Sequence, residues 1–151
     1  MMHFRKAIGL LVISTLLLHI RCETTDCITF STNAFIIQFF EKESEQPEDI
    51  DFETIEALES SIILYADTSM NVFYLPISTE KDLTTFFFRD SNGRIDTLTV
   101  GYKKSEKLVS ADCGFDLNFS DLQVIMTTFD SVVVSLNELS RLNEENIQIY
   151  R

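Results

Sequence analysis

Histidine and glycine are almost missing from this chain once its first 21 residues are set aside. The 151 residues include two histidines, His3 and His19, and no tryptophan. Without an imidazole, a Ser-His-Asp or Cys-His mechanism has no group that takes and returns the nucleophile's proton near neutral pH. Catalytic zinc held by histidine is excluded for the same reason. The remaining glycines are too scattered for a phosphate-cradling loop or a dinucleotide fingerprint: Gly93, Gly101 and Gly114.

Positive charge is also scarce. The chain has 12 lysines and arginines against 24 aspartates and glutamates, which gives a formal net charge of -12. A surface of this sign repels nucleic acid, so we expect no nucleic-acid partner. Solubility is the favoured explanation of the acidity, ahead of a specific electrostatic partner.

The first 21 residues follow the pattern of a secretory signal peptide. Arg5 and Lys6 precede an apolar run from Ala7 to Ile20. That run is shorter than the roughly 20 predominantly apolar residues that a membrane-spanning helix needs. Cys22 stands where the run stops, which resembles a bacterial lipoprotein signal, although Arg21 replaces the usual small residue and makes the lipobox atypical. We therefore expect a signal peptide over 1–21, lipidation of Cys22 and a single domain over 22–151.

The cysteine count fits this expectation. The chain has three cysteines, and an odd number in an exported protein leaves one unpaired. If lipid occupies Cys22, then Cys27 and Cys113 can form a disulfide, which an oxidising compartment would preserve. The alternative is that Cys27 and Cys113 are two unrelated buried thiols.

Short apolar or alternating segments separated by turn residues predict a mainly β chain. The Asn92-Gly93 pair predicts a tight hairpin, and Asp67 to Ser69 predict another turn. The segment from Asp49 to Leu58 fits either a strand or a helical turn, and the end from Asn137 fits a helix, a strand or a tail. The expected fold is one antiparallel β-sandwich, immunoglobulin-like or Greek-key in type. Its expected strands are 34–40, 61–66, 71–76, 83–89, 95–102, 115–119, 124–129 and 132–136.

An acidic segment near 41–53 is expected to be an exposed loop in its front half, where Pro47 interrupts regular structure. Its carboxylates are candidate oxygen ligands for calcium, but they lack the Asp-x-Asp-x-Asp-Gly order that wraps a loop around one ion. A solvated acidic loop is the favoured interpretation, so we predict no metal and no cofactor. The candidate calcium ligands in this segment are Glu45, Glu48, Asp49, Asp51 and Glu53.

Three consecutive aromatic residues, Phe86, Phe87 and Phe88, are candidate contacts for a partner protein. Successive side chains of a strand point to opposite faces, so the three cannot all face one core. Packing of Phe87 beneath a loop or a second layer is the favoured alternative to an interface.

Several segments resemble an uncharacterised lipoprotein family of Bacteroidetes-type bacteria, domain-of-unknown-function family 6452. These segments are the leader with Cys22, the stretches 27–40 and 74–77, and the stretches 96–102 and 111–115. The resemblance implies a lipid-anchored protein that faces the periplasm or the cell surface and retains Cys27 and Cys113. It implies no catalytic or site residues.

These patterns together predict an outer-membrane lipoprotein that is not an enzyme. We expect it to bind another envelope protein, or to support it structurally, while its lipid holds it to the membrane. A small-ligand or calcium-binding module is the alternative. A hydrolase using paired carboxylates is the least favoured class, because a chain rich in Asp and Glu contains such pairs by coincidence.

Overall fold

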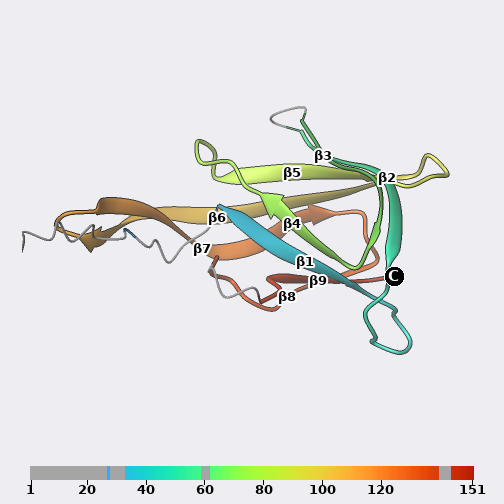
Figure 1. The fold of residues 1–151 in the computed structure, drawn as a ribbon. Coiled ribbons are helices and arrows are strands. Elements are labelled where there is room, and N and C mark those ends of the chain that lie inside the picture. The colour runs from blue at the N-terminus through green and yellow to red at the C-terminus, as the bar shows by residue number, and fades with distance from the viewer. Residues whose placement is uncertain (1–26, 28–32, 59–61, 140–143) are drawn as a thin grey trace, which may run out of the picture.

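The computed structural model describes residues 27, 33–58, 62–139 and 144–151 (Figure 1). The described residues form nine β-strands and no helix. The strands are β1 (Ala34–Phe40), β2 (Ile50–Ala57), β3 (Ile62–Met70), β4 (Val72–Pro76), β5 (Leu83–Arg89), β6 (Ile95–Ser110), β7 (Gly114–Thr127), β8 (Ser131–Val134) and β9 (Ile147–Tyr150).

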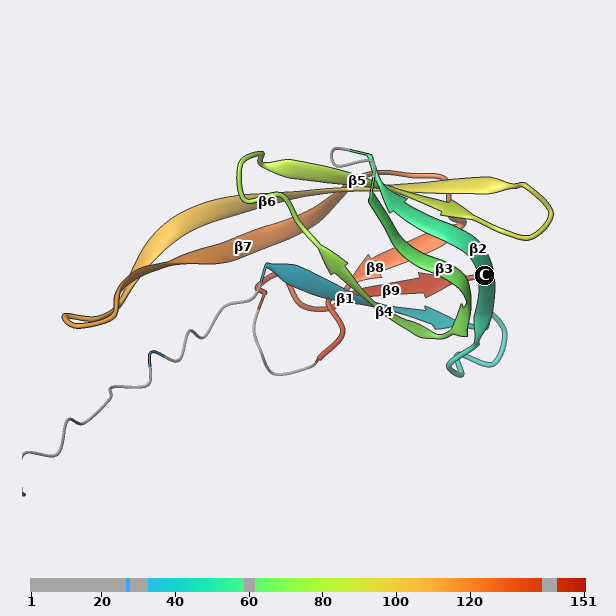
Figure 2. The ribbon, with the colours of Figure 1, turned by 45° about the horizontal axis from the view of Figure 1, so that its top comes forward.

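The strands form two packed layers, which confirms the predicted β-sandwich. One sheet has the order β4-β1-β9-β8 and the other the order β3-β2-β5-β6-β7 (Figures 1 and 2). Among the described strands, neighbours pair antiparallel except for β1 and β9, which run parallel. The C-terminal segment, for which a helix, a strand or a tail was possible, contains strand β9. The segment 49–58, for which a strand or a helical turn was possible, contains strand β2.

Phenylalanine dominates the core between the two sheets. Phe39 of β1 is fully buried and lies in ring contact with Phe52, Phe73, Phe88 and Phe129, at centroid distances of 5.5, 5.9, 6.3 and 5.8 Å. Most of these pairs are edge-to-face, the arrangement that aromatic quadrupoles favour. The alternation of β1 brings this ring inward because side chains of a strand repeat every second residue.

The predicted hairpin at Asn92-Gly93 is confirmed. It joins β5 to β6, and Gly93 has a φ of 81°, a conformation that glycine adopts without strain. The Asp90 carboxylate accepts hydrogen bonds from the backbone N–H groups of Asn92 and Arg94, both at 2.9 Å. Backbone and side chain therefore fix the same turn.

The turn predicted at Asp67 to Ser69 is wrong. These residues lie inside β3, and the chain reverses at Asn71 instead. Asp67 nevertheless has a positive φ of 46°. Asp67 is therefore a local irregularity within β3. The residues on either side of it pair with β2, which holds the backbone extended there.

Strands β6 and β7 are longer than predicted and run on past the other strands as a two-stranded ribbon (Figure 2). We call residues 105–118 the arm. Beside its turn, Cys27 and Cys113 form the predicted disulfide, with a Cα–Cα distance of 5.5 Å. The N-terminal side of the described chain is thereby bonded to the end of the arm.

Candidate functional site

The outer face of the five-stranded sheet carries a group of exposed apolar side chains on the body of the sandwich. Phe86, Leu98 and Val100 point into the core, so their sequence neighbours on β5 and β6 point outward. Leu83 on β5 is 44% exposed, and Ile125 and Met126 on β7 are 55% and 52% exposed. Isolated surface apolar residues are ordinary, but a group rimmed by charges is typical of a contact surface.

A groove of about 670 Å³ lies on this face. Gly101 of β6 forms part of its lining, and an added Cβ there would lie 3.0 Å from the Ile125 side chain. Val100 pairs with Val124 and Thr99 with Met126, so Ile125 is an extra residue in a β-bulge. The bulge and the glycine together let Ile125 lie across β6. The groove is lined by Asp82, Leu83, Gly101, Tyr102, Lys103, Lys104, Asp121, Gln123 and Ile125.

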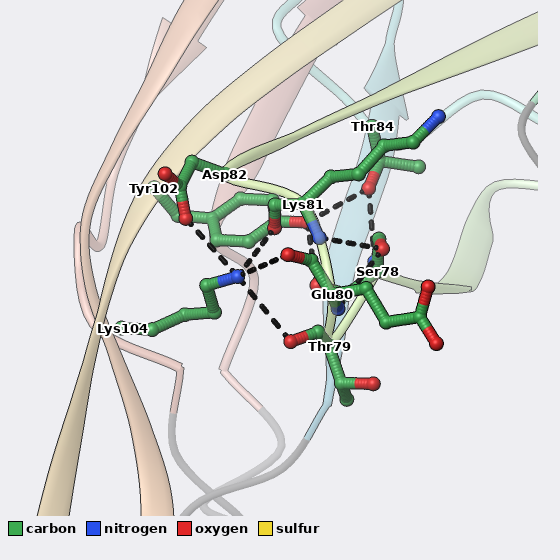
Figure 3. A network of polar contacts seen from close by, with 8 residues as sticks. All are labelled: Ser78, Thr79, Glu80, Lys81, Asp82, Thr84, Tyr102 and Lys104. Carbon is green, nitrogen blue, oxygen red and sulfur yellow. Dashed lines mark hydrogen bonds and ion pairs between the residues drawn. The ribbon is translucent and has the colours of Figure 1, made fainter.

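One wall of the groove contains Asp82, which ends the loop between β4 and β5, and Lys104 holds that loop in place (Figure 3). The Lys104 ammonium donates hydrogen bonds to the backbone carbonyls of Thr79, Glu80 and Lys81 at 3.3, 2.9 and 3.1 Å. It also forms an ion pair with Asp82 at 3.1 Å, and its side chain is only 19% exposed. The Lys104 ammonium is thus surrounded by oxygen atoms and fixes the conformation of the loop between β4 and β5.

Tyr102 fixes the inner side of the same loop. Its hydroxyl donates a hydrogen bond to the Ser78 carbonyl at 2.8 Å and lies 2.9 Å from the Thr84 hydroxyl (Figure 3). Thr84 in turn accepts a hydrogen bond from the Ser78 backbone N–H at 2.9 Å. Tyr102 is 4% exposed, so this network joins the core to the groove wall.

The opposite wall carries an ion pair in solvent. Lys103 and Asp121 lie 2.7 Å apart, with side chains 78% and 53% exposed. The hydrogen bond to Asp121 raises the pKa of Lys103 above its usual 10.5, the negative charge of Asp121 raises it further, and desolvation opposes both effects. Asp121 has a positive φ of 53°.

The groove therefore has an apolar centre between two charged walls, and such a surface is suited to binding a ligand or a partner. Its two lysines are each paired with a carboxylate. A ligand that fits would lay apolar groups on Leu83 and Ile125, and its polar groups would meet the paired charges at the rim.

The structure separates the three candidate contact residues of β5. Phe86 and Phe88 are fully buried in the core, so the prediction of a partner contact is wrong for these two side chains. They alternate inward with the strand, which is where the aromatic core needs them. Phe87 is partly exposed and lies on the outer face, two residues from Thr85 and four from Leu83.

The acidic segment does not assemble a metal site. Among the described residues, no three His, Cys, Asp or Glu side chains are placed to hold one ion. Asp49 instead accepts a hydrogen bond from the Asn71 amide at 2.6 Å, and Asp51 and Glu53 of β2 are exposed. The weaker calcium candidates, Glu45, Glu48, Asp49, Asp51 and Glu53, therefore do not converge.

The predicted signal peptide over 1–21 and the lipidation site Cys22 lie outside the described residues. Within the described part, no helix has the length and apolarity that crossing a bilayer requires. The disulfide is the one element of the export prediction that falls on described residues.

Sequence reasoning missed the residues that shape the groove. Ile125 and Met126 belong to a stretch predicted as a strand, but the bulge that turns both outward has no local sequence signature. Lys104 was missed because its partners are mostly backbone carbonyls. The pair Lys103-Lys104 directly after an alternating strand was the available signal that the strand reaches an edge of the core.

No curated protein and no solved structure matches the chain. A family model described as a family of unknown function, DUF6452, matches residues 53–151. These residues include β3 to β9, and with them both walls of the groove and the whole arm. The chain therefore belongs to DUF6452, a family of unknown function.

Proposed function

We propose that this protein is an exported, lipid-anchored accessory module that binds another envelope protein through the outer face of its five-stranded sheet. In this proposal the membrane holds the protein through a lipid on Cys22, at the outer membrane and facing the periplasm or the surface. Binding of the partner is the function, and catalysis is not part of it.

The observation that carries the proposal is the exposed apolar group around the groove. Leu83, Ile125 and Met126 come from two strands separated by β6 and stand on one sheet face. A small domain gains stability by covering such side chains, and here the fold has the second sheet only on the other face. A partner that covers Ile125 and Met126 would remove both from water and would meet the charged walls at its rim.

The compartment is supported by the disulfide. Disulfides persist in oxidising environments and are rare where glutathione and thioredoxin keep thiols reduced. Cys27 and Cys113 are bonded, which fits a chain whose first residues have the pattern of a signal peptide. The remaining cysteine, Cys22, is then the one available for lipid.

The choice of binding over catalysis rests on the chemistry of the groove. No histidine occurs beyond residue 19, and the groove lysines are engaged with Asp121 and Asp82. An apolar centre with paired charges at its edge matches the arrangement of protein interfaces, which have depleted charge at the core and polar rims.

A site-specific photocrosslink tests this function. A photoreactive phenylalanine analogue is placed at Ile125 in the full chain, and in a matched control at Val133, which is 46% exposed on β8 of the other sheet. We expect a discrete crosslinked product with one envelope protein from position 125 and none from position 133. Adding Met126→Glu should abolish that product, because a charge would then occupy the apolar contact.

Equal products from both positions would contradict the proposed surface, since they would indicate chance collisions. The absence of any product from position 125 in the native envelope would contradict a binding function at this face. Far-ultraviolet circular dichroism of the Met126→Glu variant controls for folding.

A further inference from the structure

The apolar pattern of the inner sheet face continues along the arm, beyond the second sheet. In the register of β6 and β7, Lys104 pairs with Phe119, Glu106 with Leu117 and Leu108 with Phe115. Directly opposite residues share a face, and so do residues two apart along one strand. Phe119, Leu117 and Phe115 therefore lie on the same face.

Exposure on that face rises toward the end of the arm. Phe119 is 2% exposed, Leu117 36% and Phe115 69%. Leu108, opposite Phe115, is 57% exposed. The gradient has a simple cause: β6 and β7 extend past the four-stranded sheet that covers the inner face of the body (Figure 2). Leu108 and Phe115 are thus adjacent apolar side chains in water at the tip.

The disulfide fixes where the tip lies relative to the chain's N-terminal side. Cys113 is two residues before Phe115, and its Cα lies 5.5 Å from that of Cys27. Cys22 precedes Cys27 by five residues, and five residues of any conformation reach at most about 18 Å. If Cys22 carries the lipid, the covalent path from the bilayer surface to the arm tip is therefore very short.

We propose that the tip of the arm is a membrane-contact element, in which Leu108 and Phe115 enter the headgroup region of the bilayer beside the anchor. The inference rests on the proposed lipid on Cys22. Headgroup regions are each about 5 to 7 Å deep, enough to take two side chains of a hairpin. The lipid and the apolar pair then hold the protein at two points, which limits its rotation and presents the groove away from the bilayer.

The charges near the tip indicate which lipid surface fits. Glu106 shares the apolar face, one step further from the tip, and Asp112 lies exposed in the turn. Lys107 pairs in register with Asp116, so their charges offset one another. With a net charge of -12 for the whole chain, a zwitterionic surface suits the tip better than an anionic one. Phosphatidylcholine vesicles are therefore the appropriate probe.

The test uses tryptophan fluorescence, because the natural chain contains no tryptophan. Phe115→Trp places a single reporter at the tip. Ile95→Trp is the matched control, since Ile95 is 44% exposed and begins the strand that carries Leu108. The two positions are separated by about 40 Å of extended strand. Both proteins are extracted from membranes, reconstituted in phosphatidylcholine vesicles and weighed intact by mass spectrometry.

If the inference is right, the Phe115→Trp emission shifts to shorter wavelength on vesicles and is largely lost with brominated lipids, while the Ile95→Trp emission changes in neither way. An acylated protein whose Phe115→Trp emission stays as in water would overturn the membrane contact and leave the anchor standing. A protein without an acyl chain would overturn the proposed anchor itself, and the contact with it. Adding Leu108→Glu to the Phe115→Trp protein should reduce the quenching, because a carboxylate resists leaving water.

Discussion

Strands β6 and β7 run through both the body of the sandwich and the arm, yet the two regions are held together by different forces. In the body, β6 supplies Leu98 and Val100, both fully buried against the opposite sheet. In the arm, the same strand supplies Leu108, which is 57% exposed. Strand pairing continues through both regions, so backbone hydrogen bonds do not distinguish them. The difference is the second layer, which supplies the burial that drives folding.

An isolated two-stranded ribbon is only marginally stable in water. The arm therefore depends on attachments at its two ends. At its base, Phe119 packs against Tyr102 with ring centroids 5.8 Å apart. At its tip, the disulfide joins Cys113 to Cys27. Four variants test this comparison, beginning with the largest expected effect.

Phe39→Ala should cause the largest loss of stability, about 4 kcal/mol, because it removes the ring at the centre of the aromatic core and leaves a cavity. Urea denaturation of the oxidised protein measures the change in the free energy of unfolding. Phe115→Ala is the matched control in the arm, and its effect should stay within about 0.5 kcal/mol because its ring is exposed. Similar losses for both variants would remove the distinction between body and arm.

Replacing Cys27 and Cys113 together by serine should cost about 2 to 4 kcal/mol, since the bond closes a long loop in the unfolded chain, with a sequence separation of 86. The loss acts through the unfolded state, so urea denaturation should detect it for the whole domain. Hydrogen exchange should in addition show that the arm amides exchange faster in this variant than in the natural protein, and that the increase is larger than for the amides of Leu98 and Val100. Unchanged arm protection would mean that the ribbon is stable without its tip attachment.

The body was largely predictable from sequence, because its signals are local. The strands 34–40 and 83–89 have the predicted bounds, since alternation and aromatic content both peak there. The Asn92-Gly93 turn was predictable because its backbone conformation depends on the glycine itself. Burial against a second layer produces the alternation that sequence analysis detects.

The groove and the β6 side of the arm were not predictable for the converse reason. On β7 the alternation of Phe115, Leu117 and Phe119 predicted the strand 115–119, but residues 103–107 do not alternate and therefore were not predicted as strand, although β6 continues to Ser110. The parallel pairing of β1 with β9 joins distant parts of the chain and has no local signature. The loop network depends on carbonyl groups, which every residue possesses, so the sequence did not identify the loop as the partner of Lys104.

Lys104→Met should destabilise the protein by about 1 to 2 kcal/mol, because charge-assisted hydrogen bonds to the loop between β4 and β5 are lost. Methionine is unbranched and keeps most of the length of the side chain, so packing changes little. Lys103→Met is the matched control at the next residue, and we expect no measurable change, because its ion pair is in solvent. Equal effects would show that the loop oxygens do not distinguish the two lysines. Urea denaturation near neutral pH measures both.

The smallest effect concerns the pKa of Lys103 at the junction of body and arm. Asp121 raises this pKa above 10.5, first through the hydrogen bond and then through its charge. A raised pKa of a cation means that the stabilisation is complete below pH 10.5 and is lost as the pH rises through the folded-state pKa. Asp121→Asn should therefore lower the midpoint of an NMR titration of the Lys103 side chain. Glu106→Gln, which removes a carboxylate from the arm, should leave the midpoint unchanged. A midpoint that moved equally in both variants would show that the acidic chain as a whole, rather than Asp121, sets the pKa.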